Sequence, residues 1–399
     1  PRRRLAQLAA GLAGSQPNIA VAVTGTNGKT STVEFLRQIW AAGGLPAASL
    51  GTLGVIAAGF DPGPGLTTPD PVTLAETLAR LARAGIQHAA IEASSHGLDQ
   101  FRLDGVRVAA AAFTNLTRDH LDYHGTEEAY RTAKLRLFAE LLPEGAPVVA
   151  SCDLDAMSMD ALAGIARRRR LDLRTVGAAG TAIRLLATTP RPDGQLLCVE
   201  AAGIRRQVAL PLPGRFQADN ALLAAALAVA LGERNVLDRL AELHGVRGRL
   251  ELAARLPNGA AIYVDYAHTP DALERLLTAL RPHTAGRLHV VFGAGGDRDR
   301  GKRPLMAAAA ARFADVAIVT DDNPRSEDPA AIRAEILAAL PGGREIGDRE
   351  RAIAEALNGL GRGDVLAVAG KGHEQGQTIG NAVIPFDDVS VVRRLVGTP

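Results

Sequence analysis

Short apolar runs alternate with longer segments of helical periodicity along most of the chain. Strands are predicted by apolar runs at residues 19–23, 88–92, 108–115 and 148–152. Helices are predicted by a period near 3.6 at residues 30–42, 71–84 and 214–230. Strands that alternate with helices are typical of a doubly wound, mostly parallel sheet. We therefore predict an α/β fold for this part of the chain.

The helical period fades between residues 171 and 213, where short apolar runs predict a small antiparallel β insertion. The strand–helix rhythm restarts near Arg247, with strands predicted at residues 261–264, 288–292, 316–320 and 365–368. We accordingly predict a central P-loop-type domain over residues 1–246 and a Rossmann-like α/β domain over residues 247–399. Open α/β sheets bind ligands beyond the carboxyl ends of their strands, so the loops after these strands are candidate sites.

Composition narrows the class of protein. The 399 residues include 45 basic and 43 acidic side chains, a formal charge of +2 that favours neither nucleic acid nor an anionic membrane as partner. Cys152 and Cys198 lie far apart, which argues against a disulfide framework or structural zinc. No apolar run is long enough for a membrane-spanning helix, and residues 1–11 predict an amphipathic one. We expect a cytoplasmic, monomeric, multidomain enzyme without membrane insertion.

The most informative segment is residues 21–31, where an apolar strand runs into a glycine turn, a lysine, two hydroxyl residues and a helix. Two glycines let backbone N–H groups point at phosphate oxygens, and the helix start adds its positive dipole end. Thr30 or Ser31 can hold Mg²⁺. A glycine-rich turn with a surface lysine is the alternative, but the Lys-Thr-Ser ending argues against it. The candidate ATP-binding residues are Gly25, Thr26, Asn27, Gly28, Lys29, Thr30 and Ser31.

Two further loops follow predicted strands and carry candidate metal ligands. Glu92 ends the strand at 88–92, where its carboxylate would reach a cation held by the first loop. Residues 114–125 follow the next strand. They include two histidines, one of which is His120, and two aspartates. An isolated histidine is usually structural, but clustered polar groups after a strand favour a site. Lys134 follows on a predicted helix, and its spacing alone predicts a surface lysine.

The second domain has polar loops at 265–270, 293–303, 321–329 and 370–374, each after a predicted strand. The loop at 293–303 has the composition of an anion-binding nest, with a flexible solvated loop as the alternative. The last two loops carry both charge signs, which a small zwitterion needs because arginine receives its carboxylate and Asp or Glu its ammonium group. Turn formation by Asp-Asn-Pro is the alternative at 322–324.

Taken in this order, the loops closely resemble the Mur ligases over nearly the full chain, and among them the ligases that add the third peptide residue. The resemblance implies ATP and two magnesium ions as cofactors, with Thr30, Glu92 and His120 as metal ligands. It also implies that Lys134 is carbamylated, so that the added carboxylate helps position the second ion, which replaces the surface-lysine interpretation. The implied catalytic residues are Lys29, Lys134, His120 and Glu92, and the further nucleotide contacts are Asn220, Arg249 and Asp265.

The same resemblance implies the substrates. The residues that match contacts to UDP-N-acetylmuramoyl-L-alanyl-D-glutamate are Thr67, Thr68, Ser94, Ser95 and Arg102. The residues that match positions for the incoming amino acid are Arg298, Asp322, Asn323, Arg325, Gly370 and Glu374. The form Asp-Asn-Pro-Arg at 322–325 is associated with meso-diaminopimelate. That substrate has a distal carboxylate that lysine lacks, so Arg325 is expected to decide specificity by roughly hundreds-fold.

The implied reaction is ATP-dependent formation of an amide bond through an acyl phosphate. The alternatives are a lysine-adding Mur ligase, a folylpolyglutamate synthetase-like ligase, and a nucleotide-binding protein without ligase activity. Members of the family usually carry an amino-terminal domain that holds the uridine nucleotide. Only about twenty residues precede Val21, so we expect that domain to be absent from this chain.

Overall fold

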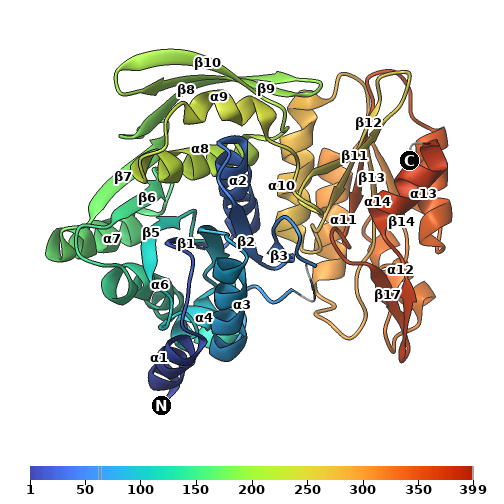
Figure 1. Cartoon of the computed structure of the whole chain (residues 1–399). Helices are drawn as coiled ribbons and strands as arrows, with labels where there is room; N and C mark the ends of the chain where they lie inside the picture. The colour runs from blue at the N-terminus through green and yellow to red at the C-terminus, as the bar shows by residue number, and fades with distance from the viewer. Residues whose placement is uncertain (62, 64, 398–399) are drawn as a thin grey trace. The chain divides into compact units, whose positions relative to one another are not determined.

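The computed structural model describes residues 1–61, 63 and 65–397. The chain forms two compact units, each drawn in Figure 1. The amino-terminal unit comprises Pro1–Thr189 and Gln195–His244, and the carboxy-terminal unit comprises Pro190–Gly194 and Gly245–Pro399. Each unit has helices against a largely parallel sheet, so the predicted α/β class is confirmed.

The amino-terminal unit is built on a ten-stranded sheet of order β10-β9-β8-β7-β6-β5-β1-β4-β2-β3. Its strands are β1 (Ile19–Thr24), β2 (Ala47–Gly51), β3 (Gly54–Ile56), β4 (His88–Glu92), β5 (Val108–Phe113), β6 (Pro147–Ser151), β7 (Asp172–Gly177), β8 (Ile183–Arg191), β9 (Gly194–Ala201) and β10 (Ile204–Leu210). The strands from β2 through β8 in this order pair in parallel, while β3 and β10 each run antiparallel to their neighbour. The carboxyl ends of β4, β1 and β5 therefore meet at one edge.

Helices cover both faces of this sheet. They are α1 (Arg2–Ala13), α2 (Lys29–Ala42), α3 (Pro71–Arg83), α4 (Ser95–Asp99), α5 (Leu121–His124), α6 (Glu127–Arg136), α7 (Ala156–Arg169), α8 (Arg215–Ala230) and α9 (Val236–Arg239). Helix α2 packs against α8, and both contact the central strands. Leu78 of α3, Leu135 of α6 and Leu162 of α7 belong to one core with the strand residues Ile91 and Phe113. Burial on both faces explains why the central strands read as continuous apolar runs.

Two sequence predictions differ from this sheet in detail. The strand predicted at residues 108–115 ends at Phe113, because Thr114 and Asn115 use their side chains to bind the carbonyl of Asn27, at 2.6 and 3.1 Å. The β segment predicted between residues 171 and 213 is present, and its strands continue the central sheet. Within it β9 and β10 are antiparallel as predicted, whereas β7 runs parallel to β6.

The carboxy-terminal unit has a six-stranded sheet of order β11-β12-β16-β13-β14-β15 and a separate hairpin. The strands are β11 (Glu251–Arg255), β12 (Ala261–Asp265), β13 (Leu288–Phe292), β14 (Val316–Val319), β15 (Arg344–Glu345) and β16 (Val365–Ala369), and the hairpin is β17 (Gly376–Ile379) with β18 (Ala382–Pro385). All pairs in the sheet are parallel except β11 with β12. The polar loops identified from the sequence thus leave β12, β13, β14 and β16 at one edge.

Two helical layers enclose this second sheet. The helices are α10 (Pro270–Leu280), α11 (Lys302–Phe313), α12 (Pro329–Leu337), α13 (Arg349–Asn358) and α14 (Asp388–Val396). Leu277, Met306 and Ile336 place α10, α11 and α12 in one core. Ile353 and Val392 place α13 and α14 in the core on the other face. This is the doubly wound arrangement, which leaves the loops at the strand ends accessible to ligands.

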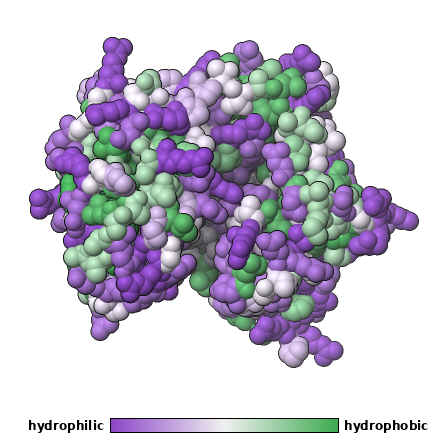
Figure 2. Space-filling view, turned by 180° about the vertical axis from the view of Figure 1, so that it is seen from behind, coloured by the Kyte–Doolittle hydropathy of each residue, from purple (hydrophilic) through white to green (hydrophobic). Residues whose placement is uncertain are grey.

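Hydrophilic residues predominate on the surface that Figure 2 shows, where hydrophobic residues form smaller groups. Some large apolar side chains remain exposed, among them Leu8 and Leu12 of α1 and Val383 of β18. Among the residues that the structure describes, no helix is both long and apolar enough to cross a membrane.

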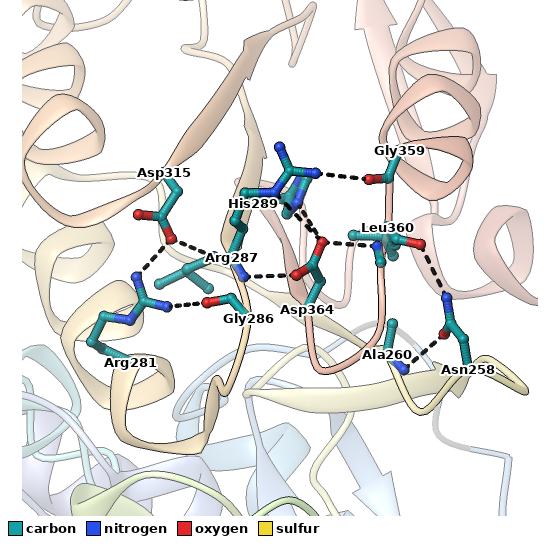
Figure 3. Close-up of polar contacts among 12 residues, drawn as sticks. Asn258, Ala260, Arg281, Gly286, Arg287, His289, Asp315, Gly359, Leu360 and Asp364 are labelled. Carbon is teal, nitrogen blue, oxygen red and sulfur yellow. Dashed lines mark hydrogen bonds and ion pairs between the residues drawn. The ribbon is translucent and has the colours of Figure 1, made fainter.

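Asp364 ties together the amino ends of β13 and β16, at the edge opposite the candidate site (Figure 3). Its carboxylate accepts hydrogen bonds from the backbone N–H groups of Arg287, at 2.7 Å, and Gly361, at 2.9 Å. The Nε2 atom of His289, on buried strand β13, lies 3.1 Å from the same carboxylate. The backbone of each strand is therefore fixed before it enters the core.

This network predicts a pH dependence of stability. Burial lowers the pKa of His289, and the opposing effect of Asp364 does not overcome it. The unfolded chain therefore binds a proton more readily than the folded one, and the stability from this site is lost as pH falls below about 6.5. We expect the urea midpoint, followed by circular dichroism, to fall less steeply between pH 7.5 and 5.5 in His289→Gln than in wild type. Equal pH slopes would contradict the prediction.

Candidate functional site

The turn between β1 and α2 has the backbone geometry of a phosphate loop. Gly28 adopts a left-handed conformation with φ +85°, and a Cβ there would lie 2.3 Å from Asn220 Oδ1. Gly25 has φ +146°, and a Cβ there would lie 1.8 Å from Thr114 Oγ1. Both positions therefore require glycine. Helix α2 has no side-chain cap, and the uncapped start of a helix is a site where anions bind.

The loop is fastened to the segment that follows β5. The backbone N–H groups of Thr26 and Asn27 donate to the carbonyl and side-chain oxygens of Asn115, at 2.9 and 3.0 Å. The Thr26 hydroxyl contacts the Thr117 carbonyl and the Tyr130 hydroxyl, each at 3.1 Å. Two of the predicted phosphate-binding residues thus use their amides to hold the loop, which leaves the start of α2 and Lys29 to meet an anion.

Two lysines converge on the carbonyl of Gly25. Lys29 Nζ donates to this oxygen at 2.9 Å and to the Thr26 carbonyl at 2.8 Å, while Lys134 Nζ reaches the Gly25 oxygen at 2.8 Å. Lys134 is 1 % exposed and lies over the Tyr130 ring, so the surface position predicted from spacing alone was wrong. Burial, reinforced by the charge of Lys29, lowers the pKa of Lys134 well below its ordinary value. Its amine is therefore biased toward the neutral, nucleophilic form.

Glu92 is the last residue of β4, and His120 lies in the loop after β5. These two strands flank β1 in the sheet. Glu92 pairs with Val23 in the register of β4 and β1 and is 1 % exposed. Its carboxylate accepts from the Thr52 backbone N–H at 2.8 Å. His120 immediately precedes α5 with φ +52°, and its Nε2 lies 3.3 Å from Asp119 Oδ2. Both side chains belong to the edge that carries the phosphate loop.

These donors meet the needs of magnesium only in part. In the described portions of the chain, no group of three or more His, Cys, Asp or Glu side chains is placed to hold a metal ion. Magnesium prefers oxygen ligands, which Thr30 and Glu92 offer. A carboxylate added to the buried amine of Lys134 would supply a further oxygen ligand beside Gly25. With such a carboxylate, the oxygen donors of these residues would suit magnesium.

Thr68 connects the residues predicted to bind the acceptor substrate. Its hydroxyl donates to the Glu92 carbonyl at 2.8 Å and accepts from the Ser94 backbone N–H at 3.0 Å. The Thr68 carbonyl accepts from Arg102 Nη1 at 2.6 Å. The structure brings all five predicted residues together beside the end of β4. They are Thr67, Thr68, Ser94, Ser95 and Arg102.

The predicted nucleotide contacts lie on both units. Asn220 of α8 lies against Gly28 in the amino-terminal unit. In the carboxy-terminal unit, Asp265 ends β12 and its Oδ2 accepts from the Leu250 backbone N–H at 2.7 Å. Burial raises the pKa of Asp265 to about 6, although Arg249 opposes the rise. The Arg249 guanidinium lies over the ring of Tyr266 at 5.0 Å.

The loops after β14 and β16 meet around a buried carboxylate. Asp322 and Asn323 are 7 % and 6 % exposed. Within the described residues Asp322 Oδ2 has no hydrogen-bond partner, and a Cβ on Gly370 would lie 2.4 Å from it. Asn323 Nδ2 donates to Glu374 Oε2 at 2.9 Å. Gly370 therefore permits the close approach of the two loops, and Asp322 keeps an acceptor for a ligand.

Arg325 is held in an unusual conformation next to these loops. Its φ is +52°, and its backbone N–H donates to the Thr378 carbonyl of hairpin strand β17 at 3.1 Å. Its Nη1 donates to the Gly296 carbonyl at 2.8 Å, and the guanidinium has further donors for a ligand. The Asp297 amide, which lies in the predicted anion nest, donates to Glu327 Oε1 at 2.7 Å and is thus already used within the protein. Arg298 on the same loop is exposed.

Three residues of the site received no role from the sequence. Lys371 is fully buried, and its Nζ lies 3.2 Å from both Asn323 Oδ1 and Glu374 Oε2. Tyr130 packs between Thr26 and Lys134. The placement of Lys371 between two glycines in a loop after a strand was a usable signal. No such signal in the sequence marks Arg349, at the start of α13, because its contacts come from segments that are distant in sequence.

Two α/β units, a glycine phosphate loop and a mixed-charge loop cluster define a multidomain nucleotide-dependent enzyme. Comparison with known families agrees with this class. Residues 23–228 match the model of the Mur ligase middle domain, and residues 248–372 match that of the Mur ligase, glutamate ligase domain. The chain belongs to the Mur ligase family and is thus an ATP-dependent ligase. The resemblance found in the sequence is confirmed.

Relatives with an assigned name are similar to nearly the whole chain. A UDP-N-acetylmuramoyl-L-alanyl-D-glutamate--2,6-diaminopimelate ligase from Caulobacter vibrioides is 57 % identical over 98 % of this chain and 81 % of the relative. The ligase of the same name from Rhizobium meliloti is 54 % identical over 100 % of this chain and 82 % of the relative.

Solved structures show the same architecture. A structure of a UDP-N-acetylmuramoyl-L-alanyl-D-glutamate--2,6-diaminopimelate ligase matches with a TM-score of 0.75 and 35 % identity, covering 99 % of this chain and 82 % of that chain. Folylpolyglutamate synthase of Mycobacterium tuberculosis complexed with ADP matches with a TM-score of 0.73 at 21 % identity, covering 92 % of this chain and 91 % of that chain. The second likeness shows a shared fold alone.

Proposed function

We propose that this chain joins meso-diaminopimelate to UDP-N-acetylmuramoyl-L-alanyl-D-glutamate at the expense of ATP, a step in the synthesis of a peptidoglycan precursor. The names of relatives more than 50 % identical support this assignment. The observation that carries it is a loop with two opposite charges three residues apart. Asp322 keeps a buried carboxylate oxygen without a hydrogen-bond partner among the described residues, and Arg325 has guanidinium donors beyond the one that binds the Gly296 carbonyl. An amino acid with a second carboxylate uses both groups, because its ammonium meets Asp322 and its distal carboxylate meets Arg325.

The remaining predicted residues complete this amino-acid site. Asn323 and Glu374 already bind each other and present the second acidic group, while Gly370 lets the two loops approach. Arg298 is exposed on the adjacent loop and supplies a further cation for a carboxylate. A substrate with two amino acid ends presents both charge signs at each end, which matches this mixture.

The reaction proceeds in two chemical steps. The D-glutamyl carboxylate attacks the γ-phosphorus of ATP, forming an acyl phosphate and releasing ADP. The diaminopimelate amine then attacks the acyl carbon, the carbon–oxygen bond to phosphate breaks, and the amine loses a proton. Lys29 and the start of α2 offset the charge on the transferring phosphoryl group. Thr67, Thr68, Ser94, Ser95 and Arg102 hold the acceptor substrate near this edge.

Magnesium would be held by Thr30, Glu92, His120 and carbamylated Lys134, and two ions are proposed. When bound, magnesium neutralises phosphate charge and orients the transferring group. Carbamylation requires a neutral amine that attacks carbon dioxide, and the lowered pKa of buried Lys134 favours that form. Its contact with the Gly25 carbonyl places the amine beside the phosphate loop.

Asn220 is proposed as a nucleotide contact in the amino-terminal unit, and Arg249 and Asp265 are proposed as nucleotide contacts in the carboxy-terminal unit. Asp265 gives this proposal a pH dependence, because its pKa of about 6 lies within the range of an ordinary assay. The ionised carboxylate accepts hydrogen bonds from a ribose, so ATP affinity is expected to fall by up to about tenfold per pH unit below pH 6. Calorimetric titration should show a smaller decline in Asp265→Asn. Identical pH profiles would contradict the contact.

We place the reaction in the cytoplasm, where ATP is available, and propose a monomer without nucleic acid or membrane partners. Near-balanced charge supports the absence of nucleic acid.

Mass spectrometry of the reaction products tests the proposal. The chain is incubated with ATP, magnesium, UDP-N-acetylmuramoyl-L-alanyl-D-glutamate and meso-diaminopimelate. We expect a product equal in mass to the two joined substrates minus water, together with ADP and phosphate. Omitting either substrate should remove the product. ADP formation without a joined product, or a product formed only on a folate acceptor, would contradict the assignment.

A further inference from the structure

A fully buried ion pair joins the first residues of α13 and α14. Arg349 and Asp388 are both 0 % exposed at their side chains. Arg349 Nε donates to Asp388 Oδ1 at 2.8 Å, and Nη2 donates to Oδ2 at 2.7 Å. Burial tends to lower the pKa of Arg349, but Asp388 raises it above its ordinary value, with Asp322 and Glu374 adding to the rise. The guanidinium therefore stays charged inside the protein.

The same guanidinium contacts the backbone in front of both amino-acid-binding loops. Arg349 Nη2 donates to the Ala369 carbonyl at 3.0 Å, and Nη1 donates to the Asp321 carbonyl at 3.4 Å. Ala369 immediately precedes Gly370, and Asp321 immediately precedes Asp322. One rigid group thus fixes the entry point of two segments that are distant in sequence. The guanidinium can therefore act on both loops without touching a ligand.

The stability that such an ion pair contributes is distinct from the geometry that it imposes on its neighbours. Two buried charges lose their hydration, and well-packed apolar replacements of similar volume are often equally stable. The planar guanidinium instead offers donors in fixed directions, which suits it to hold two carbonyls and a carboxylate at once. Its effect on Asp322 and Gly370 is then one of alignment, and the tolerance is small because a Cβ on Gly370 would lie 2.4 Å from Asp322 Oδ2.

We propose that Arg349, anchored by Asp388, is a positioning residue that sets the distance between the Asp322–Arg325 and Gly370–Glu374 loops and so controls affinity for the incoming amino acid. The inference rests on the proposed function for its kinetic consequence. Its structural consequence, the alignment of two loops, stands on the contacts alone.

The test uses a double variant that avoids leaving one charge buried without a partner. Arg349→Met with Asp388→Leu removes both charges and places apolar side chains at both positions. Arg349→Lys is the conservative variant, because it keeps the charge opposite Asp388 but loses the forked donors. Asp364→Asn is the matched control, since Asp364 also stabilises this unit but lies at the amino ends of the strands.

Two measurements are made on each variant. In the double variant, KM for meso-diaminopimelate is expected to rise by about tenfold or more, while KM for ATP stays within about twofold. Arg349→Lys should fall between wild type and the double variant, and Asp364→Asn should leave both KM values unchanged. Amide hydrogen exchange should become faster in residues 321–325 and 369–374 of the double variant but not in residues 286–289.

The outcomes separate this inference from the proposed function. A double variant with unchanged exchange in both loops overturns the inference, whether or not the wild type is active. An active wild type and a double variant with equal KM for diaminopimelate also overturn it. Faster loop exchange in a chain whose wild type makes no joined product supports the loop alignment and counts against the proposed substrate.

Discussion

Replacing Lys134 by alanine is expected to reduce kcat for the joined product by about a hundredfold to a thousandfold. The side chain is 1 % exposed and its amine lies 2.8 Å from the Gly25 carbonyl of the phosphate loop. Loss of the proposed carbamate removes an oxygen ligand for magnesium, and loss of a group that stabilises developing charge costs on the order of 10²–10³ in kcat. Steady-state kinetics at saturating substrates measure the effect.

Chemical rescue distinguishes this role from a packing role. Short carboxylic acids such as formate and acetate should restore part of the activity of Lys134→Ala, because they return a carboxylate to the space that the side chain leaves. The same acids should not restore Lys29→Ala, whose missing group is a cation. A Lys134→Ala variant that remains fully active without rescue would remove the proposed role.

Replacing Arg325 by alanine is expected to lower kcat/KM for meso-diaminopimelate by about a hundredfold, with little change for L-lysine. A guanidinium aimed at a distal carboxylate discriminates against a substrate that lacks this group. Arg325 Nη1 donates to the Gly296 carbonyl, which leaves other donors of the guanidinium for such a carboxylate. Competition assays with both amino acids give the ratio directly.

Backbone strain must be separated from this specificity effect. Arg325 has φ +52°, a conformation that alanine adopts less readily than asparagine. Arg325→Asn is therefore the matched variant, since it removes the guanidinium with less strain on the loop. Both variants should lose the preference for diaminopimelate. Retained preference in Arg325→Asn would mean that another residue recognises the distal carboxylate.

The sequence predicted the architecture where local pattern determines it. Strands such as β4 (His88–Glu92) and β13 (Leu288–Phe292) have the bounds expected from their apolar runs, because both faces of each sheet are covered. The end of β5 was misjudged by two residues. Its cause is tertiary, since Thr114 and Asn115 bind the phosphate loop through their side chains.

The sequence also predicted that the site lies at the carboxyl ends of strands, but it did not predict which of the site's side chains are buried. Helical spacing put Lys134 on the surface, because periodicity does not show what covers a helix face. Only the structure places it beneath Gly25. Likewise Arg349 contacts Asp321 and Ala369, and no local signal connects these segments. Functional contacts between distant segments depend on topology, which a local pattern does not contain.

The most direct test of the proposed ligase activity is phosphate release from ATP in the presence of UDP-N-acetylmuramoyl-L-alanyl-D-glutamate, with meso-diaminopimelate compared with L-lysine at equal concentration. Phosphate release is expected to depend on diaminopimelate and to exceed the rate with lysine by about a hundredfold or more. Equal rates with both amino acids, or a higher rate with lysine, would contradict this expectation.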